Sequence, residues 1–278
     1  MRRAFKPASL LYHALAIGLS ALFIVPLLWM VSGSLRKVGL PPPQIVEWIP
    51  DPIAWGNYAV LSEMIPLATF VKNSLIVALA GVAVTLVVAS WTGFAMAQLS
   101  SRLQRLFTTL CILLLMTPVT ALWLTRFILY KELGLINSFG ALIAPALMGS
   151  SALFVLLFYW TYRRVPNELF ESARMDGAEA FQIWWSIAIP LARPTLLAVG
   201  VLTFVHYWSD FIDPLLYLKS ESRYTLAVGL RVLQQLDITN WSLLMAGATV
   251  MTLPVLLGYA LVQRFHWLEG RLSGLQGR

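Results

Sequence analysis

The sequence predicts an all-α polytopic membrane protein that crosses the bilayer about six times. Apolar residues make up 59% of the chain, charged residues 12%, and the mean hydropathy is +0.75. An ordinary globular domain carries about 25% charged residues. Uncharged stretches occur at 7–35, 73–101, 106–125, 133–162, 194–209 and 238–263. Most reach the roughly 20 residues that a helix needs to cross the hydrocarbon layer.

These stretches define a single membrane domain over residues 1–278. We expect spans at approximately 10–31, 73–97, 106–125, 139–161, 193–213 and 242–263. Pro118 and Pro254 should kink the third and sixth spans. In the second span, Ala89, Gly93 and Ala97 form a small-residue stripe that favours close helix packing inside a bundle.

The first outer loop, residues 32–70, is the longest connection on the outer side. It carries Pro41-Pro42-Pro43, Trp48, Pro50, Pro52 and Trp55, a composition that predicts a stiff, non-helical segment. Its role is open between a simple connector and a docking surface for a partner.

The distribution of charge predicts the orientation of the chain. With the N-terminus inside, inner and outer segments each carry basic residues, but the inner ones hold the excess over acidic residues. The inner basic residues are Arg2, Arg3, Lys6, Arg102, Arg105, Arg163, Arg164, Arg174, Arg193, Arg264, Arg271 and Arg278. Cytoplasmic loops are enriched in Lys and Arg, so both termini are expected in the cytoplasm. The net charge of +7 therefore does not indicate a nucleic-acid partner.

The N-terminus also has features of a signal peptide, with basic residues before an apolar run. The run to Val31 is longer than the roughly 7–15 apolar residues of such a peptide, which favours a retained first span. Val31-Ser32-Gly33 loosely fits a cleavage site, so this alternative stays open.

Motifs for chemistry are absent from the sequence. There is no GxxxxGK[ST] phosphate loop, no GxSxG and no HExxH, and His13, His206 and His266 lie far apart. One cysteine, Cys111, can form no internal disulfide and suggests no metal site. We therefore expect no enzymatic activity, no metal and no cofactor bound by this chain.

A charged segment, residues 163–190, separates spans four and five and includes ESARMDGAEAFQIWWSIAIP. Pro166 suits the first turn of a helix. After it, Leu169, Phe170 and Ala173 recur at helical spacing on one face. Glu168, Glu171 and Arg174 should face water, with Glu171 and Arg174 as an i,i+3 pair.

The segment is predicted to turn at Asp176-Gly177, because glycine reaches left-handed backbone angles without steric penalty. A second helical stretch then runs to Pro190 and carries Phe181, Ile183, Trp184, Ile187 and Ile189. Such a helix–turn–helix suits insertion into a groove on a soluble partner. It equally suits an interfacial helix on the lipid surface, and the residues alone leave both open.

The segment resembles the "EAA" loop of permease subunits of ATP-binding-cassette (ABC) importers. That pattern reads E-A-A-x-x-D-G-A, then an aromatic residue, then I-x-x-P-x-x-x-P. The matching residues are Glu171, Ser172, Ala173, Asp176, Gly177, Ala178, Phe181, Ile187, Pro190 and Pro194, of which Ser172 departs from the core pattern by one small-for-small change.

Further stretches are similar to the carbohydrate-importing branch, in the maltose- and glycerol-phosphate-permease group. They are KNSLIVALA, LGLINS, YWSDFIDPLLYL, YTLAVGL and NWSLLMAGATVMTLPVLLGYALVQRF. The resemblance covers residues 70–265. Two departures limit it: the C-terminal WLEGRLSGLQGR replaces a glycine-rich ending that contains lysine, and Asp213 stands where the group commonly has an aromatic or apolar residue.

The resemblance implies a multi-pass permease subunit in the plasma (inner) membrane of a bacterium or archaeon, which performs no chemistry itself. Implied partners are a second homologous permease in a heterodimer, two ABC ATPases that bind ATP and magnesium, and an extracytoplasmic binding protein that delivers a sugar or sugar derivative. The loop would be the coupling helix seated in a cleft of the ATPase. Its implied coupling residues are Glu171, Ser172, Ala173, Asp176, Gly177, Ala178, Phe181 and Pro190.

Candidate substrate contacts lie at the outer end of span five. Tyr207, Trp208, Asp210 and Asp213, with His206, combine the aromatic faces and carboxylates that read sugars. Structural roles compete: Asp210 can satisfy backbone groups where the helix ends, and Trp208 can anchor at the interface. Arg126 is expected to be a snorkelling residue at the membrane boundary.

Two rival functions remain. A self-sufficient secondary transporter or channel is disfavoured because the spans hold few ionisable groups along a path. An integral-membrane enzyme that uses His206, Asp210 and Asp213 is the more remote alternative.

Overall fold

The computed structural model describes residues 7–43, 47–147, 151–236 and 240–273, with the backbone alone for 7–10 and 264–273. All regular elements in these ranges are helical, which confirms the all-α fold class. The chain divides into two compact units: Met1–Ala68 with Gly229–Pro254, and Thr69–Val228 with Val255–Arg278. The tail sequence from 267 onward was singled out as atypical, but its side chains lie outside the described residues.

The first unit contains α1 (Pro7–Ser34), α2 (Asn57–Met64) and the start of α14 (Trp241–Ser273). The outer loop was expected to be non-helical, and α2 corrects this, because its eight residues contain no proline and Asn57 fixes its start. Asn57 Nδ2 donates to the carbonyl oxygens of Ser34 at 2.8 Å and Arg36 at 2.6 Å. Arg36 pairs with Glu47 at 3.4 Å, so the loop is tied down at several points. The part of this loop at 44–46 lies outside the described residues.

Trp241 holds the other side of this loop. Its Nε1 donates to the carbonyl of Leu40 at 2.8 Å, and its ring stacks on Trp29 with 5.9 Å between centroids. Gly33 permits this approach, because a Cβ there would lie 2.8 Å from the Trp241 ring.

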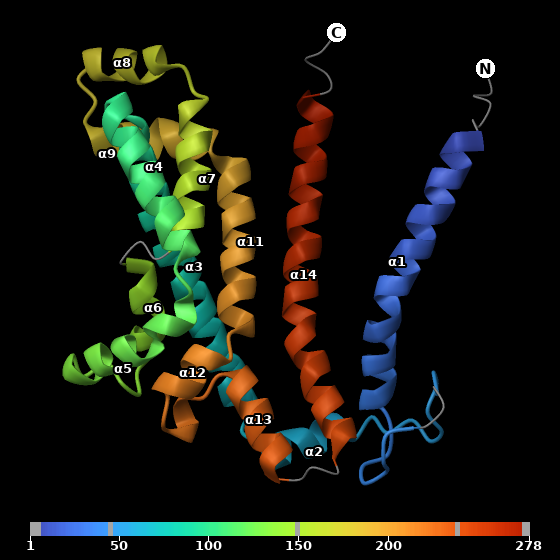
Figure 1. The fold of residues 1–278 in the computed structure, drawn as a ribbon. Coiled ribbons are helices and arrows are strands. Elements are labelled where there is room, and N and C mark those ends of the chain that lie inside the picture. The colour runs from blue at the N-terminus through green and yellow to red at the C-terminus, as the bar shows by residue number, and fades with distance from the viewer. Residues whose placement is uncertain (1–6, 44–46, 148–150, 237–239, 274–278) are drawn as a thin grey trace. The chain divides into compact units, whose positions relative to one another are not determined.

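The second unit contains the remaining helices, apart from the few residues of them that fall within 1–68 or 229–254 (Figure 1). They are α3 (Leu67–Ala97), α4 (Ser101–Met116), a 3-10 turn (Val119–Leu122), α5 (Trp123–Glu132), α6 (Phe139–Leu147), α7 (Ala152–Arg163), α8 (Asn167–Met175), α9 (Ala180–Ile183), a π-helical turn (Trp184–Ala188), α10 (Ile189–Leu191), α11 (Arg193–Ser209), α12 (Ile212–Tyr217), a 3-10 turn (Glu221–Arg223) and α13 (Leu226–Leu236). Helices α3, α13 and α14 cross the boundary between the units.

Within the described ranges, four helical stretches are long and apolar enough to cross a membrane, or six if two bent pairs are each one span. The third expected span is a bent pair: α4 ends at Met116, Pro118 follows, and the axis turns by 86°. Proline removes a backbone donor and clashes with the preceding turn, which accounts for the break. The expected kink at Pro254 does not interrupt α14, which is continuous through it.

The fifth expected span is shorter than predicted. Helix α11 ends at Ser209 rather than at 213, so Asp210 and Asp213 lie beyond it, and α9–α10 meets it at 83°. The fourth expected span, 139–161, appears as α6 and α7, and residues 148–150 between them lie outside the described part.

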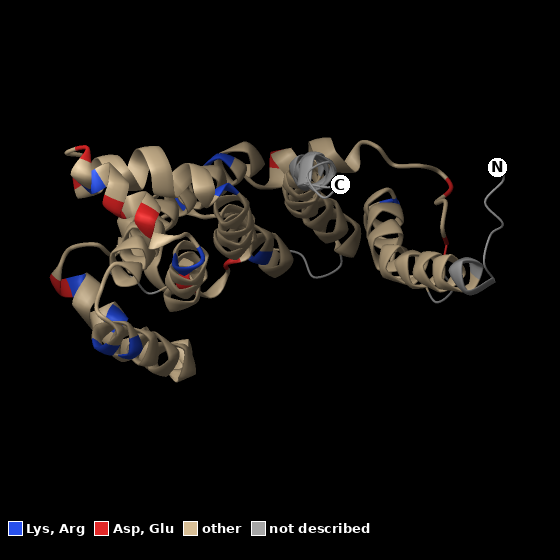
Figure 2. Cartoon of the chain, turned by 90° about the horizontal axis from the view of Figure 1, so that it is seen from above, with Lys and Arg blue, Asp and Glu red and all other residues tan. Residues whose placement is uncertain are grey.

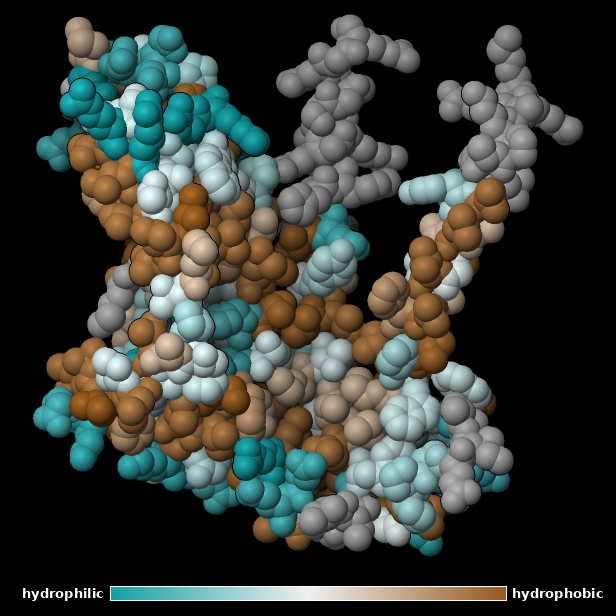
Figure 3. Space-filling model, viewed as in Figure 1, coloured by the Kyte–Doolittle hydropathy of each residue, from teal (hydrophilic) through white to brown (hydrophobic). Residues whose placement is uncertain are grey.

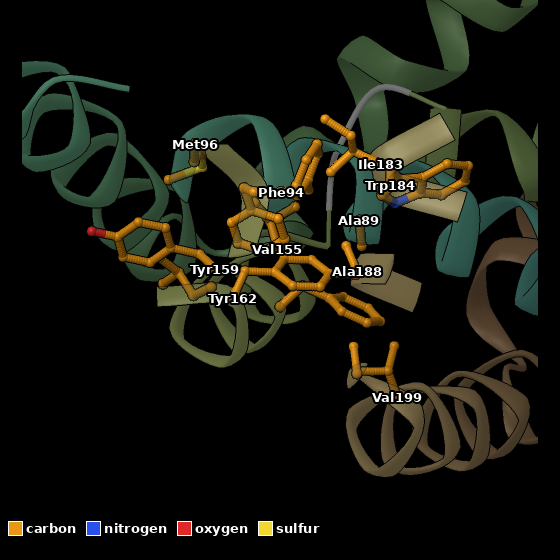
Figure 4. Close-up of a cluster of buried hydrophobic side chains, with 14 of the residues drawn as sticks. Ala89, Phe94, Met96, Val155, Tyr159, Tyr162, Ile183, Trp184, Ala188 and Val199 are labelled. Carbon is orange, nitrogen blue, oxygen red and sulfur yellow. The ribbon is translucent and has the colours of Figure 1, made fainter. Parts of the chain in front are cut away.

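A buried cluster joins α3, α7, α8, α9, the π-helical turn and α11 (Figure 4). Its members include Ala89, Phe94, Tyr159, Ile183, Trp184 and Val199. The expected small-residue stripe lies in it: a Cβ at Gly93 would fall 2.7 Å from Phe158 Cβ and 2.8 Å from Tyr159 N. Only glycine allows this approach of α3 to α7, and close packing is what holds helices together where burial gives little drive.

The surface of the second unit matches a membrane environment. In Figure 3 a broad apolar belt lies between hydrophilic residues at α8 and those near α5 and α12. Charged residues are sparse along the helices in Figure 2. Large apolar side chains such as Leu113, Leu124 and Leu202 are at least half exposed, as lipid-facing residues are.

Candidate functional site

Residues 163–190 fold as the predicted helix–turn–helix, with α8 lying across the ends of α4 and α7 (Figure 1). Helix α8 ends in a Schellman motif. Ala178 N donates to Ala173 O and Gly177 N to Arg174 O, both at 3.0 Å. Gly177 has φ +84°, the left-handed conformation that this motif requires. The turn at Asp176-Gly177 is thus built as its sequence indicates.

The second helical stretch begins with a capping box. Glu179 N donates to Gln182 Oε1 at 3.0 Å, and the Glu179 side chain accepts from the backbone of Gln182. From Trp184 to Ala188 the helix widens into a π-turn. Ile183 is 1% exposed and Trp184 3%, whereas Phe181 is 59% exposed.

Helix α8 is held by one aromatic side chain. Phe170 is 1% exposed and meets Phe94 edge-on, with 5.6 Å between ring centroids. Ala173 is also buried, but Leu169 is 44% exposed, so its assignment to the buried face was wrong. The buried residues of α8 are Phe170 and Ala173.

The polar side of α8 differs from the prediction in one pair. Arg174 does not pair with Glu171; its Nη2 donates to Gln98 Oε1 at 2.5 Å. Glu168, Glu171 and Arg174 are otherwise exposed, as expected. A long, flexible arginine reaches the end of α3, which the spacing within one helix cannot reveal.

The coupling residues named from the sequence occupy one continuous segment. Those that are exposed are Glu171, Ser172, Asp176, Gly177, Phe181 and Pro190. Ala178 is half-buried and Ala173 is buried. Met175 was not singled out, yet at 88% exposed it is an apolar side chain presented beside the turn. Its position directly before the Asp176-Gly177 turn could have indicated this exposure from the sequence.

A polar cavity of about 680 Å³ lies beside α8. It is bounded by residues 97–104, where α3 turns into α4, and by the junction of α7 and α8. Gln98, Ser100, Gln104, Arg163, Glu171 and Arg174 are among its lining residues. On the side of the cavity, α8 therefore contacts the rest of the protein mainly through polar side chains.

The candidate substrate residues are placed differently from one another. Trp208 is 1% exposed and Tyr207 8%, so neither presents a free aromatic face. The Tyr207 ring packs where a Cβ of Gly81 would stand, 2.3 Å from Cε2. Asp210 Oδ1 accepts weakly from Asp213 N at 3.4 Å, at the start of α12, which is the structural role considered for it.

Asp213 forms an ion pair that the sequence did not suggest. Arg126 Nη1 lies 3.1 Å from Asp213 Oδ2, with side chains 17% and 21% exposed. Arg126 is therefore a partner of α12 rather than a snorkelling residue. Burial raises the pKa of Asp213, which Arg126 opposes, and burial and the nearby Asp213 raise the pKa of Asp210.

Two asparagines hold the segment that follows α12. Asn137, at φ 61°, accepts at Oδ1 from Lys219 N at 3.1 Å and Ser220 N at 3.0 Å. Asn73 Nδ2 donates to Ser222 O at 3.0 Å and Tyr224 O at 2.9 Å. Both lie in stretches that drew attention by resemblance, LGLINS and KNSLIVALA, but their contacts could not be inferred from the sequence.

No group of three or more His, Cys, Asp or Glu side chains is placed to hold a metal ion in the described ranges.

Comparisons with known proteins identify the family. Residues 89–269 match the family described as binding-protein-dependent transport system inner membrane component, and this chain belongs to that family. It is therefore a multi-pass permease component of the inner membrane. Because such components are not themselves enzymes, the prediction of no enzymatic activity is confirmed.

The chain is similar to named permeases over nearly its whole length. It is 29% identical over 270 residues to the lactose transport system permease protein LacG of Rhizobium radiobacter, covering 95% of each chain. It is 28% identical over 279 residues to the arabinooligosaccharides transport system permease protein AraQ of Halalkalibacterium halodurans, covering 98% of this chain and 99% of that one.

The fold also matches a solved structure, a chain of a bacterial ABC transporter involved in the import of the acidic polysaccharide alginate. The TM-score is 0.77 at 19% identity, covering 94% of this chain and 99% of that one. This likeness supports the polytopic α-helical fold.

Proposed function

We propose that this chain is a permease subunit of an ABC importer for a sugar or sugar derivative. It forms half of the translocation pathway and converts ATP hydrolysis on partner subunits into alternating access. The observation that carries the coupling role is the α8 turn, in which a Schellman motif at Gly177 presents Met175 and Asp176 outward from a buried Phe170.

The distribution of polar groups favours docking of residues 163–190 on a soluble partner over their lying on the lipid surface. A helix lying on lipid would direct a continuous apolar face outward. Here the main apolar anchor, Phe170, faces the protein, and the exposed apolar side chains of α8, Leu169 and Met175, alternate with exposed polar ones. Those polar residues are Glu171, Ser172 and Asp176. A short helix with an exposed tip and a polar rim suits a cleft on a soluble ATPase.

A carbohydrate substrate is supported by the relatives, whose names give lactose and arabinooligosaccharides. The partners we propose are a second homologous permease, two ABC ATPases that bind ATP and magnesium, and an extracytoplasmic binding protein. Both termini and α8 lie on the cytoplasmic side in this proposal, because the basic excess falls there.

We propose that only part of the predicted substrate cluster faces a passage. Of Tyr207, Trp208, Asp210 and Asp213, the two carboxylates are retained as candidate substrate contacts. Asp210 and Asp213 are half-buried beyond the end of α11, and His206 beside them is exposed. These polar groups can face a passage, whereas Tyr207 and Trp208 are buried and contribute to packing.

Purification from native membranes tests this function. The chain, tagged in its outer loop, is extracted in a mild detergent and its companions are identified by mass spectrometry. We expect a second six-span permease and an ATPase with a phosphate loop, and a co-purifying binding protein can be analysed for its bound sugar. Recovery of the chain alone, still transporting after reconstitution, would instead establish the secondary transporter.

A further inference from the structure

One glutamine joins three helices where α3 turns into α4, a region that we call the α3–α4 corner (residues 97–104). Gln104 lies in the first turn of α4. Its Nε2 donates to Leu99 O at 2.8 Å and to Ala97 O at 3.1 Å. The last carbonyls of a helix have no partner within the helix, and Gln104 supplies one for the end of α3.

The other end of the same amide is bound to α7. Gln104 Oε1 accepts from Arg163 Nη1 at 2.9 Å and from the Tyr159 hydroxyl at 3.2 Å. Arg163 Nη1 also donates to the Tyr159 hydroxyl at 3.2 Å, and the guanidinium lies 5.9 Å from the centre of that ring. The amide nitrogen of Gln104 thus donates both of its hydrogens to the end of α3, and the amide oxygen accepts from α7.

The α3–α4 corner is also bound to α8, through Arg174 and Gln98. Arg163 is the last residue of α7, and only residues 164–166 connect it to the first residue of α8, Asn167. A displacement of α8 therefore reaches the corner directly at Gln98 and through α7 at Gln104. Both contacts line the polar cavity, so little apolar packing supports the corner on this side.

We propose that Gln104 is a positioning residue that transmits movement of α8 to α3 and α4. This inference rests on the proposed coupling function of α8. With Gln104 in place, the end of α7 moves α3 and α4 together with α8. Without it, the link through α7 is lost, and the Arg174–Gln98 bond alone does not carry the full movement of α8 to the corner.

A purely structural role for Gln104, as the cap of α3, makes a different prediction. Loss of a cap lowers the stability and the yield of assembled complex, but leaves each assembled complex coupled. Loss of transmission leaves assembly and basal ATP hydrolysis intact and removes the response of the ATPase to the binding protein. The two roles are therefore separable.

The experiment uses the complete transporter in lipid nanodiscs with its own binding protein, carrying the sugar with which it purifies. ATP hydrolysis per assembled complex is measured with and without binding protein, for wild type, Gln104→Leu and Gln104→Glu. Gln104→Glu keeps the oxygen that accepts from Arg163 and Tyr159 but loses the donor to α3. Gln263→Leu, at an exposed position of α14, is the matched control.

We expect Gln104→Leu to hydrolyse ATP at the basal rate while its stimulation by binding protein falls on the order of tenfold, within the range for residues that couple distant sites. Gln104→Glu should lie between it and wild type, and Gln263→Leu should match wild type. Unchanged stimulation in Gln104→Leu would overturn the inference, as would a loss explained by a lower yield of assembled complex. A wild-type complex whose transport needs no ATP would overturn the proposed function itself, and this inference with it.

Discussion

Arg174 Nη2 donates to Gln98 Oε1 at 2.5 Å, which joins α8 to the end of α3 across 76 positions of sequence. The bond takes Arg174 away from Glu171, its neighbour on the same helix, and leaves that carboxylate exposed. The position of α8 is therefore set by a buried phenylalanine on one side and this charge-assisted bond on the other. Glu171 is left available to a cationic partner.

Removing this bond should loosen α8 without unfolding the protein. We expect Arg174→Ala and Gln98→Ala each to cost about 0.5–1.5 kcal/mol, because the bond is exposed to water. The double variant should cost no more than the larger single change, since both remove the same contact. Thermal unfolding of the purified protein measures this, and fully additive losses would show that the two side chains act independently.

Gly177 should tolerate only residues that accept left-handed backbone angles. A Cβ there meets nothing within 4 Å, so the cost of substitution comes from the backbone alone, about 1–2 kcal/mol for a β-branched residue. We expect Gly177→Val to abolish transport-coupled ATP hydrolysis and Gly177→Asn to retain most of it. Gly39→Val is the control, since Gly39 has the same φ of +84° and equally open surroundings.

Equal activity of Gly177→Val and wild type would contradict a role for the turn. Loss of activity in Gly39→Val to the same degree would assign the effect to general destabilisation.

The helix–turn–helix could be predicted from the sequence because its determinants are local. Gly177 and Asp176 fix the turn, and Phe170 and Ala173 mark the buried face within a few residues of it. The pairing of Arg126 with Asp213 and of Asn73 with Tyr224 could not be predicted, because each joins segments far apart in the chain.

Helix α2 was missed because the prolines of the outer loop lie on either side of it, up to Pro52 before Asn57 and at Pro66 after Met64, and none lies within it. The burial of Trp208 was missed because a membrane aromatic can equally face lipid, a passage or a neighbouring helix.

Even alanine at position 81, the smallest substitution of Gly81, should destabilise the protein. A Cβ at this position would lie 2.3 Å from the Tyr207 ring, and overpacking of this kind costs about 1–3 kcal/mol. We expect Gly81→Ala to lower the unfolding temperature and Gly81→Ala with Tyr207→Leu to recover part of the loss. Gly18→Ala, where nothing lies within 4 Å, should be neutral or stabilising by up to about 1 kcal/mol. The same sign for both glycines would refute the close contact.

Replacing Arg126 alone should lower the free energy of unfolding more than replacing both Arg126 and Asp213. Arg126→Met leaves the half-buried Asp213 carboxylate without its cation, and we expect a loss of roughly 1–3 kcal/mol after allowing for partial exposure. Arg126→Met with Asp213→Asn should be closer to wild type. For comparison, Arg36→Met breaks a pair in which Glu47 is 53% exposed and should cost less. A double variant worse than both single variants would argue against a direct pair.

Asn137 should stabilise the segment that follows α12. Asn137→Ala removes the acceptor for Lys219 N and Ser220 N and places alanine at φ 61°, so a loss of at least about 2 kcal/mol is expected. Asn137→Asp keeps the acceptor and should lose less. Limited proteolysis near residues 218–225 reports the change. Asn167→Ala, at an exposed position of α8, serves as the control and should leave cleavage unchanged.

ATP-driven uptake by the reconstituted complex tests the central claim most directly. The assembly purified from native membranes is sealed into vesicles with ATP enclosed on the side of α8, and its loaded binding protein carries isotope-labelled sugar outside. We predict accumulation that requires hydrolysable ATP and binding protein and survives the collapse of proton and sodium gradients. Accumulation that continues with a non-hydrolysable analogue and stops when the gradients collapse would contradict the account, and the chain would then be an ion-coupled transporter.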